Sequence, residues 1–176
     1  MIGAILATDM AKHQQMIRDL SQHAAERTVD IPPSFSLEVI CHVADLCNCA
    51  IDWDLSRVWA RRVCDEATAQ AQRELAFGLQ VDKSTPYTDE ELFTRQLVFL
   101  DVFVRPLFKA AAILYPGARN RLNAIASCRE GCKGGLRALG KTIQDDKPED
   151  RGVSTVPRRT QQPSATSVST QQDAKA

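Results

Sequence analysis

The sequence has no excess of either charge and few aromatic residues. Its 22 Lys and Arg residues balance 22 Asp and Glu residues, so the formal net charge at pH 7 is +0. A chain without a net positive field gives no indication of binding nucleic acid or an anionic membrane surface. Runs of β-branched residues bounded by turn signals are nearly absent, which favours an all-α fold. We also find no Gly-rich phosphate loop and no nucleophile elbow of a serine hydrolase.

Long apolar segments are absent too. The longest apolar run, residues 97–104, contains Asp101 and is far too short to span a bilayer. Met1-Ile2-Gly3 lacks the basic region that opens a signal peptide, and Asp9 interrupts the apolar residues that follow. The sequence therefore predicts a soluble protein without membrane insertion.

The six cysteines occupy positions in the sequence that are typical of small apolar core residues. Cys128 and Cys132 share one predicted helix face, while Cys47 and Cys49 crowd the end of another helix. This usage predicts reduced thiols and a cytoplasmic location. Cys47-x-Cys49 with His42 nearby lacks the paired-knuckle spacing of structural zinc sites, so we do not expect zinc there.

Apolar periodicity and turn signals predict a series of helices. The first covers residues 3–26, and Pro32-Pro33 separates it from a helix capped by Ser34 or Ser36. The later helices cover residues 54–77, residues 88–114 with a kink or restart at Arg105-Pro106, and residues from about 118 to a fading end at Gly134-Gly135. The third helix stops at Gly78, and Thr88 to Glu91 reads as a capping box that opens the fourth.

Each of the first four helices carries an apolar stripe that we expect to face the core. The stripes are Ile2, Ile5, Leu6, Met10, His13, Ile17 and Leu20; Leu37, Ile40, Cys41, Ala44 and Cys47; Leu55, Val58, Trp59, Val63 and Ala67; and Leu92, Phe93, Gln96, Leu97, Phe99, Leu100, Phe103 and Val104. Beyond about residue 144, Ser, Thr, Gln, Pro and charged residues dominate. We therefore expect a folded unit at residues 1–135 and a disordered polar tail at 136–176.

Three polar features interrupt these stripes. Asp45 lies at the edge of an apolar face, where a buried carboxylate needs either a hydrogen bond to a helix end or a metal or substrate. Gln96 and Phe99 point the same way on their helix, which suits either a planar heterocycle or a core glutamine bonded to a backbone carbonyl. Asp9 and His13 are four residues apart, the spacing of an ordinary ion pair.

Four motifs in register resemble the class I cyclic nucleotide phosphodiesterase family over roughly residues 2–125. Ile5-Leu-Ala-Thr-Asp-Met-Ala-Lys-His13 resembles the family's ILATDMxKH helix, and His42-Val-Ala-Asp-Leu-Cys-Asn48 resembles xxADxSN. Trp59 with Glu66 fits the W…xEF helix. The segment Arg95-Gln-Leu-Val-Phe-Leu-Asp-Val-Phe-Val-Arg-Pro-Leu-Phe108 resembles SQxGFIxxxxxPLxE. The resemblance implies an all-α helical bundle of the phosphodiesterase HD-domain type.

The resemblance also implies roles for six residues. Asp45 matches a ligand of a two-metal centre that holds Zn2+ and Mg2+ or Mn2+, and Gln96 matches the amide that bonds the purine edge. The remaining matches line the substrate pocket: Phe99 stacking on the base, Val63 on the opposite apolar side, Asn48 and Met10. The implied activity is metal-dependent hydrolysis of cAMP and/or cGMP to the 5′-monophosphate, in a cytoplasmic enzyme for which a homodimer is compatible with the family.

Several residues depart from the family pattern. Cys49 stands where proline often follows the asparagine, Val98 replaces a glycine, Arg95 replaces a small residue, and Ala67 replaces an aromatic. The family's HNxxH and HD segments, which supply the general-acid histidine and three metal ligands, have no match here. We therefore expect an N-terminally truncated catalytic domain that is inactive alone. The alternatives are a non-catalytic helical module that binds a nucleotide or protein, and an unrelated helical bundle.

Overall fold

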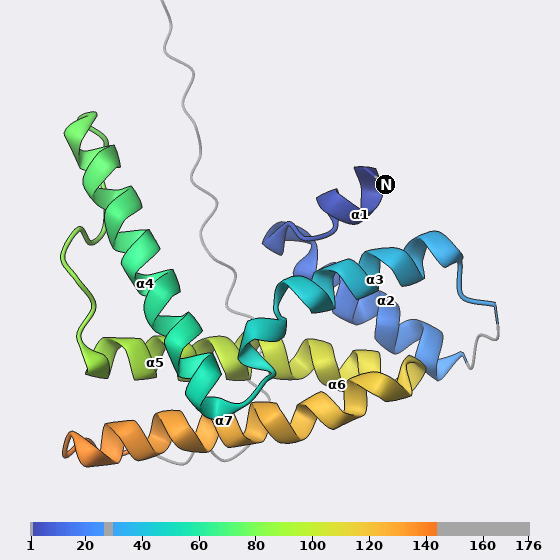
Figure 1. The fold of residues 1–176 in the computed structure, drawn as a ribbon. Helices are drawn as coiled ribbons and strands as arrows, with labels where there is room; N and C mark the ends of the chain where they lie inside the picture. The colour runs from blue at the N-terminus through green and yellow to red at the C-terminus, as the bar shows by residue number, and fades with distance from the viewer. Residues whose placement is uncertain (1, 27–29, 144–176) are drawn as a thin grey trace, which may run out of the picture. The chain divides into compact units, whose positions relative to one another are not determined.

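The computed structural model describes residues 2–26 and 30–143, and every regular element among them is helical (Figure 1). The α-helices are α1 (Ile2–Leu6), α2 (His13–Ala25), α3 (Pro33–Asp45), α4 (Trp53–Ala76), α5 (Asp89–Phe99), α6 (Arg105–Leu114) and α7 (Arg119–Ala138). Short 3-10 turns occupy Met10–Lys12, Cys47–Cys49 and Pro116–Ala118, and a π-helical segment occupies Leu100–Val104. The predicted all-α class is confirmed. Residues 144–176 of the expected tail lie outside the described residues.

Helices α5 and α6 form one nearly continuous rod, which α7 follows along its length (Figure 1). The rod starts at the predicted capping box, because Thr88 Oγ1 accepts from the Glu91 amide at 3.2 Å and Glu91 Oε2 accepts from the Thr88 amide at 2.9 Å. Helix α2 packs on α6, whereas α4 crosses α5 and α7 near its own N-terminus. The rod therefore connects the two ends of the fold.

The predicted restart at Arg105-Pro106 takes the form of a π-helical segment. The Arg105 amide bonds the carbonyl of Leu100, five residues earlier, and α6 then begins with Pro106 in its first turn. Proline has no amide hydrogen, and in a regular helix its ring collides with the carbonyl four residues before it. The wider π turn accommodates Pro106 without ending the rod.

Two glycines let α7 approach its neighbours closely. A Cβ atom on Gly131 would lie 2.3 Å from the Trp53 ring, and one on Gly135 would lie 2.4 Å from the Phe93 ring. The helix consequently continues through Gly134-Gly135, where the sequence predicts its end, and stops at Ala138. Gly131 and Gly135 make room for rings and do not break the helix.

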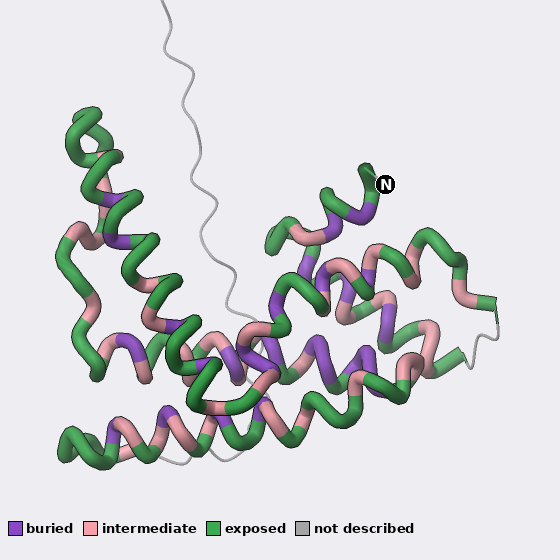
Figure 2. Tube along the Cα trace, in the orientation of Figure 1, coloured by how far each residue is buried: buried purple, intermediate pink, exposed green. Residues whose placement is uncertain are grey.

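The core has two clusters of buried side chains, seen as the purple stretches of Figure 2. One cluster joins α2, α3 and α6 around Leu20, Val39 and Leu107. The other joins the π segment, α6 and α7 around Leu100 and Phe108, with Cys128 and Cys132 fully buried. All six cysteines are free thiols, in agreement with the sequence.

The single helix predicted for residues 3–26 is wrong, because the chain breaks at Asp9. The Asp9 carboxylate accepts from the Ala11 amide at 2.9 Å, and Thr8 Oγ1 donates to the Ile5 carbonyl at 2.8 Å. Side chains that bond nearby backbone in this way compete with the helix. The predicted stripe is exposed at its start, with Ile2 76% and Ile5 66% exposed.

His13 pairs with a second histidine and not with Asp9 as the spacing predicts. His13 Nδ1 lies 2.9 Å from His42 Nε2, both side chains are fully buried, and the His13 ring meets the Phe103 ring edge-on at 5.5 Å. Burial lowers the pKa of His13, and the neighbouring His42 lowers it further. Burial also lowers the pKa of His42, although Asp45 opposes that shift. Both rings are therefore favoured in the neutral form.

The apolar stripes of α3 and α4 are predicted to face the core, and this prediction is wrong. On α3, Leu37 and Ile40 are exposed, while Val39 and His42 are buried. On α4 the buried residues are small or hydroxylated, namely Ser56, Ala60, Thr68 and Ala71. Small residues permit close helix packing, so the larger apolar side chains of α4 remain outside. The predicted serine cap is wrong as well, since α3 has Pro33 at its start and no side-chain cap.

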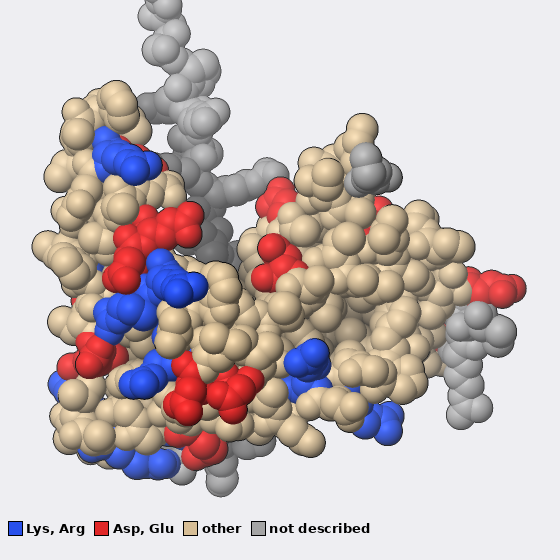
Figure 3. Space-filling model, viewed as in Figure 1, with Lys and Arg blue, Asp and Glu red and all other residues tan. Residues whose placement is uncertain are grey.

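Charge is distributed unevenly on the face drawn in Figure 3. Acidic and basic side chains gather over α4 and α5, whereas the surface over α1 and α3 carries fewer of them. Within residues 2–26 and 30–143, no helix combines the length and apolarity needed to cross a membrane.

Candidate functional site

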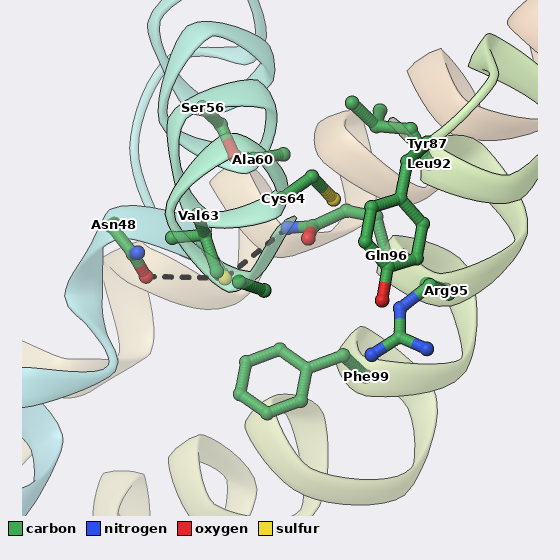
Figure 4. Close-up of a pocket in the computed structure, with 12 residues that line it drawn as sticks. Asn48, Ser56, Ala60, Val63, Cys64, Tyr87, Leu92, Arg95, Gln96 and Phe99 are labelled. Carbon is green, nitrogen blue, oxygen red and sulfur yellow. Dashed lines mark hydrogen bonds between the residues drawn. The ribbon is translucent and has the colours of Figure 1, made fainter. Parts of the chain in front are cut away.

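A cavity of about 260 Å³ lies between α4, α5 and the 3-10 turn Cys47–Cys49 (Figure 4). Ligand pockets typically enclose about 300–1,000 Å³, so this one suits one ring system of a larger ligand. The side chains around it are mostly apolar. They are Asn48, Cys49, Ser56, Ala60, Val63, Cys64, Ala67, Tyr87, Leu92, Arg95, Gln96 and Phe99.

Helix α5 presents Leu92, Gln96 and Phe99 to this cavity. These residues lie four and three positions apart, so one helix face carries all of them. The capping box at Thr88 fixes where α5 begins, and therefore which residues face α4. The predicted shared direction of Gln96 and Phe99 is confirmed.

A short chain of hydrogen bonds crosses the cavity wall (Figure 4). Gln96 Nε2 donates to Cys49 Sγ at 3.2 Å. Cys49 Sγ donates to Asn48 Oδ1, also at 3.2 Å. The Gln96 amide is thus bonded to a thiol, whereas the core interpretation of the sequence expects a backbone carbonyl.

Burial keeps the thiols of this wall protonated. It raises the pKa of Cys49 to about 11, although the hydrogen bond from Gln96 opposes the shift. Burial likewise raises the pKa of Cys64, and the nearby charges of Arg95 and Arg61 act in the opposite direction. Neither cysteine is activated as a nucleophile, because the thiolate is the reactive form.

Tyr87 and Arg95 border the cavity on its charged side. The Arg95 guanidinium lies 4.9 Å from the centroid of the Tyr87 ring, and Arg61 Nη1 donates to the Tyr87 carbonyl at 2.7 Å. Tyr87 lies between the helices predicted for residues 54–77 and 88–114, and it therefore has no role predicted from the sequence. Its position next to the Thr88 cap was the available signal, since a cap holds the preceding residue near the helix start.

The structure brings together four of the six residues that the family resemblance implies. Asn48, Val63, Gln96 and Phe99 all line the cavity. Met10 does not line it, and its side chain is 39% exposed in the 3-10 turn Met10–Lys12.

Asp45 lies apart from this cavity, exposed at the last residue of α3. The desolvation cost inferred from its apolar neighbours therefore does not arise. His42, one turn earlier, points into the core and bonds His13. The described part of the chain contains no group of three or more His, Cys, Asp or Glu residues arranged to hold a metal ion. One exposed carboxylate does not fit a two-metal centre by itself.

Comparisons with known proteins agree on the family. A family model described as 3'5'-cyclic nucleotide phosphodiesterase matches residues 1–125. The chain is 29% identical over 140 residues to the probable 3',5'-cyclic-AMP phosphodiesterase pde-4 of Caenorhabditis elegans, covering 73% of this chain and 21% of the relative. It is also 29% identical to the 3',5'-cyclic-AMP phosphodiesterase 4C of Mus musculus, with 73% of this chain and 20% of that relative covered.

A solved structure shows the same fold. The phosphodiesterase domain of the RhoPDE fusion protein from the choanoflagellate Salpingoeca rosetta superposes with a TM-score of 0.72 at 22% identity, covering 79% of this chain and 46% of that one. The chain thus spans about a fifth of the curated relatives and less than half of the solved domain. With the family model matching well over half of its residues, the chain belongs to the 3',5'-cyclic nucleotide phosphodiesterase family.

Proposed function

We propose that this chain supplies the base-binding wall of a 3',5'-cyclic nucleotide phosphodiesterase, an enzyme that hydrolyses the cyclic phosphate to a 5'-monophosphate. The observation that carries the proposal is that the Gln96 amide and the Phe99 ring line the same cavity. Two cAMP phosphodiesterases are among its relatives, which favours cAMP as the nucleotide.

The cavity offers the groups that a purine requires. Gln96 can both donate to and accept from the edge of a base, and Phe99 provides a ring face for stacking. Val63 approaches from α4, so apolar groups line the cavity from two helices (Figure 4). Asn48 adds a second amide beside them. A planar heterocycle with polar atoms on one edge matches this arrangement.

Asp45 is proposed as a single carboxylate ligand for a divalent cation, with Zn2+ and Mg2+ or Mn2+ as the family pair. Its exposure at the end of α3 leaves the carboxylate accessible to an ion. Because the described residues do not complete such a centre, no hydrolytic step is assigned to them. We further propose a cytoplasmic location, since the six thiols are free.

Nucleotide binding by the full chain tests the proposal. Isothermal titration with cAMP should give saturable binding, and Gln96→Ala should weaken it by roughly 1–3 kcal/mol, the value of one or two hydrogen bonds. Gln70→Ala is the matched control, because Gln70 is an exposed glutamine of α4 that bonds Glu74. Equal loss in both variants, or no saturable binding, would contradict the proposal. Binding without turnover is the result expected of this chain, because its described residues do not complete a metal centre.

A further inference from the structure

A second hollow lies between α3, α6 and the corner at which α7 begins, and we call it the α3–α6 groove. Its volume is about 380 Å³, and the residues that define it are Val39, Val43, Ala44, Phe108, Ala111 and Arg121. The described residues that line it include none of those that line the cavity of Gln96 and Phe99. A ligand of the groove would therefore be held by a separate set of side chains.

The floor of the groove is part of the core and is therefore fixed in shape. Val39, Phe108 and Ala111 are each 1% exposed and belong to the two buried clusters. Small residues on both sides leave the space above this floor open. Ala44 stands on α3, and a Cβ atom on Gly117 would meet no other atom within 4 Å. A preformed apolar surface of this kind binds an apolar ligand without first being ordered.

Polarity is confined to one end of the groove. Tyr115 Oη donates to Ser36 Oγ at 2.9 Å, so this hydroxyl already has a partner. Arg121 is the single charged side chain among the described residues that line the groove. It uses one of its five N–H groups on the Ala50 carbonyl at 3.4 Å. Arg121 also lies in the first turn of α7, which has no side-chain cap, and a helix N-terminus favours an anion.

We propose that the α3–α6 groove binds a medium-chain fatty acid, whose carboxylate pairs with Arg121 and whose acyl chain lies over Val39, Val43, Phe108 and Ala111. The planar guanidinium of arginine matches a carboxylate with two parallel hydrogen bonds. An acyl chain needs no hydrogen bonds, whereas an extended peptide brings backbone N–H and C=O groups that an apolar floor leaves without partners. One cation at the end of an apolar groove therefore favours an amphiphile with one carboxylate.

Isothermal titration of the full chain with octanoate and with 1-octanol tests the role of the charge. Octanoate should bind saturably at one site and about tenfold more tightly than 1-octanol, because only the acid can form a charge-assisted hydrogen bond. Arg121→Gln should weaken octanoate binding about tenfold and leave 1-octanol binding unchanged. Arg119→Gln is the matched control, since it removes the same charge two residues away at an exposed position that does not line the groove.

Three results of these titrations would overturn the proposal. They are the absence of saturable octanoate binding, equal affinities for octanoate and 1-octanol, and a loss in Arg119→Gln as large as that in Arg121→Gln. The titrations contain no nucleotide. Failure of the chain to bind cAMP would therefore contradict the proposed function and leave this test intact.

Methyl NMR of the full chain locates the bound octanoate. The methyl resonances of Val39, Ile40 and Val43 should shift saturably, whereas those of Val63, in the other cavity, should stay in place. Shifts at Val63 alone would place the ligand in that cavity and refute the proposal. Ala44→Leu fills the groove from its exposed wall and should weaken binding of both octanoate and 1-octanol. Undiminished binding in this variant would contradict the assignment to the groove.

A second copy of the chain is the competing occupant of this apolar surface. Sedimentation velocity distinguishes it from the fatty acid. A dimer that Ala44→Leu converts to a monomer, in a chain that binds no octanoate, would assign the groove to self-association and end the fatty-acid proposal. Octanoate binding by a monomeric chain would support the proposal.

Discussion

Two polar pairs lie inside this fold, and they are enclosed to different degrees. His13 and His42 join segments 29 residues apart and are completely buried, with Phe103 packed on one ring. Cys49 and Gln96 join segments 47 residues apart, and their contact borders a cavity. The first pair presents polar atoms only to the protein. The second pair borders the cavity with part of its hydrogen-bonding capacity unused, which is why the proposed function assigns ligand binding to it and not to the histidines.

Removal of a ring from the enclosed pair should have the largest effect on stability. His42→Ala leaves a cavity in the core and removes the hydrogen-bond partner of His13, so we expect a loss of about 3 kcal/mol in the free energy of unfolding. Urea denaturation followed by circular dichroism measures it. His23→Ala, at a half-buried ring beside Phe35, is the comparison and should cost less. Equal losses of unfolding free energy would show that the enclosed pair contributes no more to stability than the half-buried His23.

The same pair should make stability depend on pH. Burial lowers the pKa of both rings below about 6.5, the value for histidine in an unfolded chain. Below that pH the unfolded chain binds protons more readily, so the stabilisation is fully present above about pH 6.5 and is lost as the pH falls through the folded-state pKa values. The urea midpoint should therefore drop between pH 7.5 and pH 5.

The double variant His13→Phe, His42→Leu provides the control for this pH dependence. It replaces both titrating rings by apolar side chains, so the midpoint should change less over the same pH range. An unaltered pH profile in the double variant would assign the effect to other groups.

The cavity pair should contribute least to stability. Gln96→Met keeps the length of the side chain and removes one hydrogen bond to a sulfur, so the unfolding free energy should fall by less than about 1 kcal/mol. Denaturation with urea, alongside His42→Ala, compares the two pairs directly. A loss as large as that of His42→Ala would mean that Gln96 mainly holds the core together.

Sequence reasoning predicts the helices of this protein better than the faces they bury. The capping box at Thr88, the stop at Gly78 and the interruption before Pro106 all act over a few residues, and all are confirmed. Gly78 has a φ of +76°, which favours glycine at a helix end. Such signals need no knowledge of what packs against the helix.

The buried face of a helix depends on the elements packed against it, so apolar periodicity alone predicts the wrong buried face here. On α4 the large apolar side chains of Val58 and Trp59 are exposed, whereas Ser56 and Ala60 are buried. Apolar spacing identifies a stripe on a helix, but it does not show which face the neighbouring helices cover. Where two helices cross closely, the buried face carries small residues and not the large apolar ones. The same limit explains why Asp45 is exposed although its neighbours suggest burial.

The residues of the candidate site were partly predictable. Gln96 and Phe99 share a helix, so their spacing alone places them on one face. Asn48 and Val63 come from the family resemblance, and the structure places them beside that face. The Cys49 contact could not be predicted, because it joins a 3-10 turn to a helix 47 residues later.

The π-helical segment Leu100–Val104 also limits how insertions and deletions can be tolerated in this chain. It holds one residue more per turn than an α-helix, so deleting one residue there would restore regular spacing along the whole rod. A π turn takes up its one extra residue locally, so such a deletion would leave α6 close to its present orientation relative to α5. Leu107 and Phe108 would stay in their two clusters, and Gln96 and Phe99 would keep their places. Homologues that lack one residue here should therefore need no compensating changes in α2 or α7, whereas a deletion within α6 itself would rotate the rest of that helix by about 100°.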